Sequence, residues 1–439
     1  METSTAGKFW IVSADMGYGH QRAVAPLKDY AEGGIITVGD SATISKSERR
    51  AWKRMLFLYE ALSRASSLPV IGKPLFGILN TLLKIPAYYP FRDLSHPTFQ
   101  VKRLEAAIDN GLCKGMLDEV MTRRLPLVTS FFAPAIAADM SGVGSVYCII
   151  CDSDINRVWV AKNPYESRII YFSPCGRATR RLRLYGVPPE RIHTTGFPLP
   201  EELLGGRDLS LLKHNLSQRL YLLDPKRKFH TMHGKSVEYF LGDRTEFNKD
   251  RLLTITYAVG GAGAQKETAD RILRSLEEKL KEGEIRINLI AGTKEPVFRY
   301  FNDLKKKYAD GNENLNIVFE PSLAEYFKKF NSVLHETDIL WTKPSELSFY
   351  SALGIPIIIS PPIGSHEKFN RIWLREINAG IKQIDPDHTS DWLFDLLNKG
   401  RFAELAWSGF LKGRKLGTYK ITDILVNGFT SAGESPLER

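Results

Sequence analysis

Short apolar runs alternate with amphipathic stretches along the first part of the chain. Residues 8–13 predict a strand, which leads through a glycine-containing turn into a helix expected over residues 21–32. Further apolar runs predict strands at residues 35–38, 125–129, 145–151 and 168–172. Apolar runs of strand length that are joined by helices are typical of a parallel sheet, so this part predicts an α/β domain.

The same plan starts again after an interruption. Residues 198–250 hold Pro, Gly and many charges without a clear apolar period, which predicts an interdomain connection with an insertion. Strands are then expected at residues 252–259, 285–291, 315–319, 339–342 and 355–359, with a helix at 265–281. We therefore expect an N-terminal domain at 1–198, a linker at 199–250, a C-terminal domain at 251–415, and a helix with a frayed tail at 416–439.

The composition agrees with two or three globular domains. The 439 residues are 43% hydrophobic and 25% charged, which argues against a disordered or multi-span membrane protein. No apolar stretch of about 18 residues and no secretory leader is visible, so we expect a cytoplasmic protein. The four cysteines lack the repeated spacing of a zinc ribbon, and reduced thiols are expected.

The first glycine turn carries candidate chemistry. Gly17 and Gly19 allow a ligand to approach the backbone, and the helix that follows offers its N-terminus to an anion. His20 stands at the start of that helix, at the carboxyl edge of the predicted sheet, where such folds bind ligands. A neutral imidazole there can accept a proton from a hydroxyl. A tight turn whose histidine merely caps a helix explains this segment equally well.

Two later segments add polar groups. The turn Gly260-Gly261-Ala262-Gly263 lies between a strand and a helix, where backbone N–H groups can face a diphosphate, although such turns also serve helix–sheet packing. Polar residues then gather after two neighbouring strands: Thr342, Lys343, Ser345, Glu346, His366, Glu367 and Asn370. Together they suit the hydroxyls of a sugar and a ribose. Taken singly, Glu346 is a helix cap and Glu367 a solvated charge.

Five motifs in one order give the chain a family resemblance. Residues 8–415 resemble a GT-B fold glycosyltransferase of the family 28 type, similar to monogalactosyldiacylglycerol synthases and processive diacylglycerol glucosyltransferases. The matching segments are Gly17 to His20, Cys151 to Asp154 with Trp159, Tyr185 to Pro198, Thr342 to Pro344, and His366 to Asn370. The resemblance implies an α/β fold with two Rossmann-like domains that face each other across a cleft.

The resemblance also implies roles for the matching residues. His20 would be the general base for the acceptor hydroxyl, with Asp152 as a second catalytic residue and with Gly17, Tyr18 and Gly19 as an acceptor-side loop. Donor binding would fall to Gly260, Gly261, Ala262, Gly263, Thr342, Lys343, Glu346, His366, Glu367 and Asn370. The family inverts the anomeric carbon in one displacement and needs no bound metal or other cofactor.

The sequence departs from the family pattern around the donor ribose. Ser345 and Glu346 replace two glycines, and Ser351 stands where the family has a glutamate that grips the ribose. Glu346 is one candidate substitute for that contact, and a donor other than a UDP-sugar is the alternative. His366 replaces a glutamine and brings in a titratable ring.

A basic block lies within the N-terminal domain. Residues 46–103 hold eleven Lys or Arg but three acidic residues, which indicates an anionic partner surface. Trp52, Lys53, Arg54 and Phe76 are the expected membrane contacts, because basic residues beside apolar ones suit an interfacial helix. The alternative is an apolar stripe that packs on its own domain. No nucleic-acid-binding motif appears, so nucleic acid is not an expected partner.

These features predict an inverting glycosyltransferase that moves a sugar from a nucleotide diphosphate, with UDP as the first candidate, to a hydroxyl of a lipid-like or polyprenyl-like acceptor. The expected location is the cytoplasm or, as a peripheral protein, the inner face of an anionic membrane. Two alternatives stay open. One is a sugar-nucleotide 2-epimerase of the same fold, which needs carboxylates such as Asp15, Asp152, Asp154 or Glu367 near the sugar. The other is a binding protein that has lost turnover.

Overall fold

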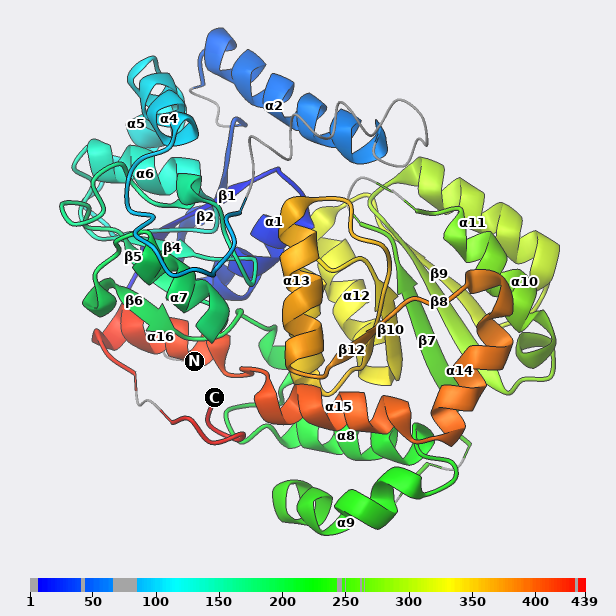
Figure 1. Ribbon diagram of the computed structural model, residues 1–439. Helices are drawn as coiled ribbons and strands as arrows, with labels where there is room; N and C mark the ends of the chain where they lie inside the picture. The colour runs from blue at the N-terminus through cyan, green and yellow to red at the C-terminus, as the bar shows by residue number, and fades with distance from the viewer. Residues whose placement is uncertain are drawn as a thin grey trace, which may run out of the picture.

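A computed structural model of the chain shows two α/β lobes, each built on one parallel sheet (Figure 1). It describes residues 7–40, 44–65, 85–242, 247–248, 250–260, 263, 265–430 and 433–439, with the main chain alone at 58–65. The predicted site residues Gly261 and Ala262 and the predicted membrane contact Phe76 lie outside the described residues.

The first lobe contains a six-stranded parallel sheet in the order β2-β1-β3-β4-β5-β6. Its strands are β1 (Phe9–Ala14), β2 (Ala31–Val38), β3 (Leu127–Thr129), β4 (Val146–Ile149), β5 (Ile170–Ser173) and β6 (Ile192–Thr194). Its helices are α1 (Tyr18–Val24), η1 (Ala25–Tyr30), α2 (Lys46–Ala65), α4 (Phe99–Asp109), α5 (Lys114–Val120), α6 (Phe132–Met140), η2 (Arg157–Trp159), α7 (Gly176–Leu184) and η3 (Pro189–Arg191). Strand β1 is buried along its whole length, as expected for an inner strand covered on both faces.

The second lobe repeats this plan with the sheet order β12-β11-β10-β7-β8-β9. Its strands are β7 (Leu253–Ala258), β8 (Ile285–Gly292), β9 (Leu315–Phe319), β10 (Ile339–Thr342), β11 (Ile357–Ile359) and β12 (Gly380–Lys382). Its helices are α10 (Thr268–Lys281), α11 (Glu295–Tyr308), α12 (Leu323–Glu336), η5 (Glu346–Leu353), α13 (Ser365–Glu376), η6 (Pro386–His388), α14 (Thr389–Asn398) and α15 (Arg401–Lys412). The predicted GT-B architecture, two Rossmann-like domains with parallel sheets, is confirmed.

The helix predicted over residues 21–32 is wrong. Helix α1 already begins at Tyr18 and ends at Val24, a short 3-10 helix with Pro26 in its first turn follows, and β2 starts at Ala31. Proline has no N–H to donate and its ring clashes with the carbonyl four residues earlier, so a continuous α-helix through this position is unfavourable. The strands β6 and β12 were also missed, because each has three residues and little apolar pattern.

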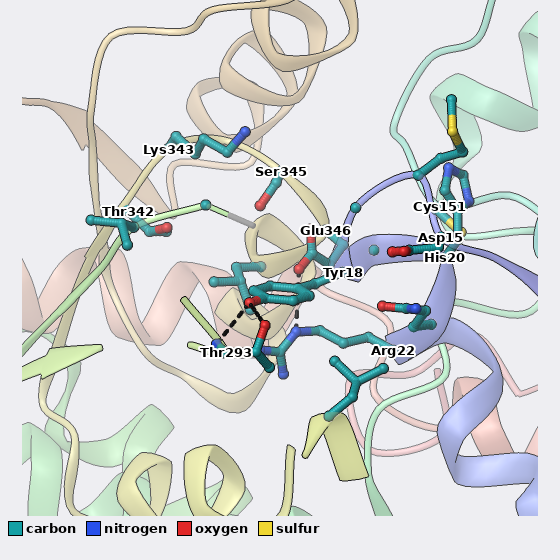
Figure 2. Close-up of a pocket in the computed structure, with 18 of the residues that line it drawn as sticks. Asp15, Tyr18, His20, Arg22, Cys151, Thr293, Thr342, Lys343, Ser345 and Glu346 are labelled. Carbon is teal, nitrogen blue, oxygen red and sulfur yellow. Dashed lines mark hydrogen bonds and ion pairs between the residues drawn. The ribbon is translucent and has the colours of Figure 1, made fainter. Parts of the chain in front are cut away.

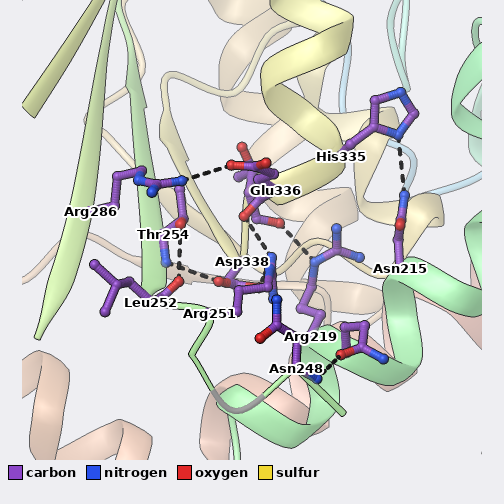
Figure 3. A network of polar contacts seen from close by, with 12 residues as sticks. Asn215, Arg219, Asn248, Arg251, Leu252, Thr254, Arg286, His335, Glu336 and Asp338 are labelled. Atoms are coloured by element: carbon purple, nitrogen blue, oxygen red, sulfur yellow. Dashed lines mark hydrogen bonds and ion pairs between the residues drawn. The ribbon is translucent and has the colours of Figure 1, made fainter. Parts of the chain in front are cut away.

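The segment expected as a linker contains η4 (Glu201–Leu203), α8 (Ser210–Leu222) and α9 (Lys228–Leu241). Helix α8 is fastened to the second lobe by Arg219, which lies near Asp338 and Arg251 (Figure 3). Arg219 donates to the carbonyl oxygens of Thr337 (2.8 Å) and Leu353 (3.0 Å). Burial lowers the pKa of Arg219 to about 10. Beside it, burial raises the pKa of Asp338 to about 6, although its ion pair with Arg251 (2.8 Å) acts in the opposite direction.

The last helix, α16 (Gly417–Asn427), returns to the first lobe (Figure 1). There the hydroxyl of Thr418 donates to the carbonyl oxygen of Leu199. The tail that was expected to be frayed is held in place over residues 433–439. The backbone N–H of Lys415 donates to the carbonyl oxygen of Arg439 (2.7 Å), and Arg414 pairs with Glu434 (2.7 Å).

Candidate active site

Loops at the carboxyl ends of the strands in both lobes enclose a cavity of about 280 Å³ (Figure 2). The first lobe lines it with residues that follow β1 and β4, and the second with residues that follow β7, β8 and β10 and with the start of α13. The structure brings together these predicted residues: Gly17, Tyr18, Gly19, His20, Asp152, Gly260, Thr342, Lys343, Glu346, His366 and Glu367. Open parallel sheets bind ligands at this edge, so the cavity is the candidate active site.

His20 is oriented as a base. Its Nδ1 lies 2.7 Å from the carbonyl oxygen of Ser130, which can only accept a hydrogen bond, so Nδ1 carries the proton of the neutral ring. The Nε2 atom therefore keeps its lone pair. Burial lowers the pKa of His20, while the Ser130 hydrogen bond and the charge of Asp152 oppose this and the nearby His366 adds to it. The net effect keeps the ring neutral to a lower pH than usual.

Lys343 and Glu367 form a buried ion pair on the donor side of the cavity. Their Nζ and Oε1 atoms lie 2.6 Å apart, and the other carboxylate oxygen accepts from the backbone N–H of Ile363 (2.6 Å) at the start of α13. Burial, the largest single influence, would raise the pKa of Glu367. The charges of Lys343 and His366, together with the hydrogen bonds from Lys343 and Ile363, outweigh burial, so the pKa is lowered. Gly260 leaves room for this pair, since a Cβ there would lie 2.1 Å from Cε of Lys343 and would force the lysine side chain to shift.

Glu346 forms an ion pair between the two lobes. Its carboxylate forms an ion pair with Arg22 of the first lobe (3.2 Å), and the two side chains are 9% and 2% exposed. Arg22 also donates to the hydroxyl of Tyr326 (3.0 Å) and lies over the rings of Phe327 and Phe330 in α12. In this structure the carboxylate therefore joins the two lobes, and it also lines the cavity.

Tyr18 crosses the cleft in the same way. Its hydroxyl accepts from the backbone N–H of Thr293 (2.9 Å) at the end of β8 and lies 2.9 Å from the Thr293 hydroxyl (Figure 2). Its ring packs against Tyr326, with 5.2 Å between the ring centroids. The sequence did not indicate Arg22 or Thr293, because the role of each depends on a contact with a residue of the other lobe.

Three predicted donor-side residues, and Ser351 at the position where the family has a glutamate, have hydrogen-bond partners within the protein. The hydroxyl of Thr342 donates to the carbonyl oxygen of Ala258 (3.0 Å) and ties β10 to β7. The N–H of Gly263 closes the turn by donating to the carbonyl oxygen of Gly260 (2.7 Å). Ser351 is fully buried, and its hydroxyl donates to the carbonyl oxygen of Ser348 (2.8 Å), so it leaves no ribose contact at that position. The side chain of Asn370 contacts the first lobe, as described below.

One predicted membrane contact is wrong. Trp52 is 6% exposed, packs against Phe131 and donates its indole N–H to Glu48 (3.4 Å). The apolar stripe of α2 at this position thus covers the first lobe. Lys53 and Arg54, the next two residues of the helix, are exposed, and so is Phe57.

Two searches of the described residues gave negative results. Among the helices of the described residues, none combines the length and the apolar composition needed to cross a bilayer. In the same part of the chain, no three side chains of His, Cys, Asp or Glu gather as they would around a metal ion.

Comparisons of sequence place the chain near one class of enzymes. Residues 295–426 match the model of a domain of unknown function (DUF6938). Over 235 residues the chain is 21% identical to the processive diacylglycerol beta-glucosyltransferase of Bacillus pumilus (strain SAFR-032), which covers 53% of this chain. The match spans 49% of that relative, about half of its length. It supports the resemblance to family 28 type glycosyltransferases that the motifs predict.

Solved structures that match most of the chain include MnaA, a UDP-GlcNAc 2-epimerase and MurG. The S. aureus MnaA structure with UDP is 11% identical, with 95% of this chain and 96% of that chain covered and a TM-score of 0.47. The UDP-GlcNAc 2-epimerase of Neisseria meningitidis, bound to UDP-GlcNAc, is 13% identical, with 96% and 100% covered and a TM-score of 0.47. MurG of Acinetobacter baumannii is 13% identical, with 96% and 100% covered and a TM-score of 0.45.

Proposed function

We propose that this protein is an inverting glycosyltransferase that moves a sugar from a nucleotide diphosphate, first of all UDP, to a hydroxyl of a lipid-like acceptor at a membrane surface. The observation that carries the proposal is the state of His20. A neutral imidazole lines the cavity between the lobes, and its Nδ1 is committed to Ser130, which leaves Nε2 as the base. The likeness to a diacylglycerol glucosyltransferase supports the choice of acceptor.

In the proposed reaction, Nε2 of His20 takes the proton of the acceptor hydroxyl. The acceptor oxygen forms a bond to the anomeric carbon while the bond from that carbon to the diphosphate breaks, and the nucleoside diphosphate leaves with the electron pair. The second lobe lines the cavity with the Gly260 turn, Lys294 and Lys343, which are suited to a diphosphate. No cofactor is proposed.

The small volume of the cavity supports a proposal about motion between the lobes. At about 280 Å³ it lies just below the range of roughly 300–1,000 Å³ that is typical of ligand pockets, and Tyr18 spans it. A nucleotide sugar is a large ligand for a cavity of this volume. We therefore propose that donor entry separates Tyr18 from Thr293 and Arg22 from Glu346 by a hinge motion between the lobes.

An activity assay tests the proposal. The purified full chain is incubated with UDP-glucose, UDP-galactose or UDP-GlcNAc and with vesicles that contain diacylglycerol. We expect UDP release that depends on both the donor and the acceptor, and a glycolipid with the inverted anomer. Epimerised nucleotide sugar without any acceptor would instead establish the epimerase, for which Asp15 and Asp152 line the cavity as candidate carboxylates. UDP binding by calorimetry without either product would indicate a binding protein.

Membrane contact is a separate part of the proposal and rests on the exposed Lys53 and Arg54. We expect the double variant Lys53→Glu/Arg54→Glu to bind phosphatidylserine-containing vesicles on the order of 25-fold more weakly, because each surface cation near an anionic membrane contributes about 1 kcal/mol. Sedimentation with vesicles measures the partitioning. The matched control, Lys306→Glu/Lys328→Glu, changes the same charge on exposed positions of the second lobe. Equal loss in both variants would contradict a specific role of α2.

A further inference from the structure

Asn370 joins the two lobes through a fully buried side chain. It lies in α13, and its amide nitrogen donates to Oδ1 of Asp152 (2.8 Å) and to the carbonyl oxygen of Pro344 (3.1 Å). Its amide oxygen accepts from the backbone N–H of Ser153 (2.7 Å). Both amide hydrogens and the amide oxygen are thus used inside the protein. The side chain therefore has no hydrogen left to donate to a donor sugar in this structure.

The three partners also determine which way the amide points. A backbone N–H must face the amide oxygen, whereas a carboxylate and a carbonyl oxygen must both face the amide nitrogen. Reversing the amide would place like groups together at all three contacts. The orientation of Asn370 is therefore unique, and it fixes one carboxylate oxygen of Asp152 from the opposite lobe.

The contact between Asn370 and Asp152 bears on the chemistry of the site, because the Asp152 carboxylate and His20 line the same cavity. Burial lowers the pKa of His20, and the negative charge of Asp152 is among the influences that raise it again. The position of this carboxylate therefore affects how readily the base holds a proton.

We propose that Asn370 is a positioning residue, which holds the Asp152 carboxylate beside His20 and so couples closure of the two lobes to the protonation of the base. This inference rests on the proposed function for its consequence in catalysis. Helix α13 provides the connection between the cavity and Asn370. Its first turn carries His366 and Glu367 at the cavity, and Asn370 follows one turn later. A movement of α13 away from the first lobe would release Asp152.

Helix α13 has a second contact with the first lobe, which supplies a matched control. At its last residue, Glu376 forms an ion pair with Arg177 of α7 (2.7 Å), and the Glu376 side chain is half-exposed. The variant Glu376→Gln weakens the docking of α13 without touching Asp152. An effect that comes only from looser docking would therefore appear in this variant as well.

The decisive measurement is the pKa of His20, followed by NMR titration of the histidine ring in the full-length protein. It needs no enzyme activity, so the inference can fail or succeed independently of the proposed function. In Asn370→Leu, which keeps the approximate shape but removes the hydrogen bonds, Asp152 is free to turn away. We expect the pKa of His20 to fall by about 0.5 to 1, because an imidazolium loses part of a nearby negative charge.

A double-mutant cycle separates positioning from packing. Asp152→Asn also removes the charge and should lower the pKa of His20. If Asn370 acts through Asp152, adding Asn370→Leu to Asp152→Asn produces no further fall, and Glu376→Gln leaves the pKa unchanged. A full additional fall in the double variant, an unchanged pKa in Asn370→Leu, or an equal fall in Glu376→Gln would each overturn the inference.

Where sugar transfer is detected, kinetics add a second readout. We expect Asn370→Leu to lower kcat on the order of 10-fold and to move the acidic limb of the kcat/KM profile to lower pH, with a small change in the KM for the nucleotide sugar. A large rise in that KM with an unmoved acidic limb would instead show that Asn370 binds the donor sugar directly, and would overturn the inference.

Discussion

Replacing His20 with alanine is expected to lower kcat for sugar transfer by about 10²–10⁴-fold, which is the usual contribution of a general base. The physical reason is that Nε2 accepts the hydroxyl proton in the cavity, while Nδ1 is held by the carbonyl oxygen of Ser130. His20→Asn should lose about as much, although its amide can still donate to that carbonyl. The variants are compared by initial rates of UDP release at saturating donor and acceptor.

The control for this prediction is His193→Ala, a half-buried histidine on β6 of the same lobe and outside the cavity residues. We expect it to retain most of the wild-type rate. The wild-type rate should also fall as the pH drops through the pKa of His20, because only the neutral ring is a base. Since burial lowers that pKa, the fall should begin below the value of about 6.5 that is usual for histidine. Full activity in His20→Asn would reject His20 as the base.

Replacing Glu346 with alanine is expected to destabilise the protein by about 3–5 kcal/mol, because it leaves the buried guanidinium of Arg22 without its counter-charge. The lost ion pair lies at the interface between the lobes, since Arg22 is in α1 and Glu346 is in η5. Urea unfolding of the full chain, followed by tryptophan fluorescence, measures the free energy of unfolding.

Two comparisons make this prediction specific. Glu277→Gln removes the partner of Lys281 on the exposed face of α10 and should cost less than about 1 kcal/mol. The double variant Arg22→Met/Glu346→Leu removes both buried charges together and should recover a large part of the loss. If Glu346→Ala were as stable as Glu277→Gln, the ion pair between the lobes would contribute little to the fold.

Much of the fold could be predicted from local pattern. The runs at 315–319 and 339–342 coincide with β9 and β10, and other strands were predicted to within a few residues. Inner strands of parallel sheets are apolar on both faces, so they stand out in a sequence. Helix α8 was not predicted, because its buried face includes Arg219, whose hydrogen bonds to carbonyl groups of the second lobe satisfy the charge. No periodicity of apolar residues reports such a contact.

The candidate site also has features that local pattern predicts and contacts that it does not. Glycine turns after strands placed His20 and Gly260 at the carboxyl edges of the sheets, and the end of a predicted strand placed the segment after β10 there. Whether each polar group faces a ligand or another residue was not predictable. Trp52 could not be told from a membrane anchor, because an amphipathic helix shows the same stripe whether lipid or its own lobe covers it.

Two α/β lobes, and a histidine that follows a glycine turn at the carboxyl edge of the first sheet, can be predicted from the amino-acid sequence. These features depend on residues close together in the chain, whose spacing sets strand, turn and helix. The ion pair of Glu346 with Arg22 and the contact of Asn370 with Asp152 become visible in the folded chain. Those pairs are separated by more than 200 residues, and a buried charge or amide takes its role from whichever group the folded chain places beside it.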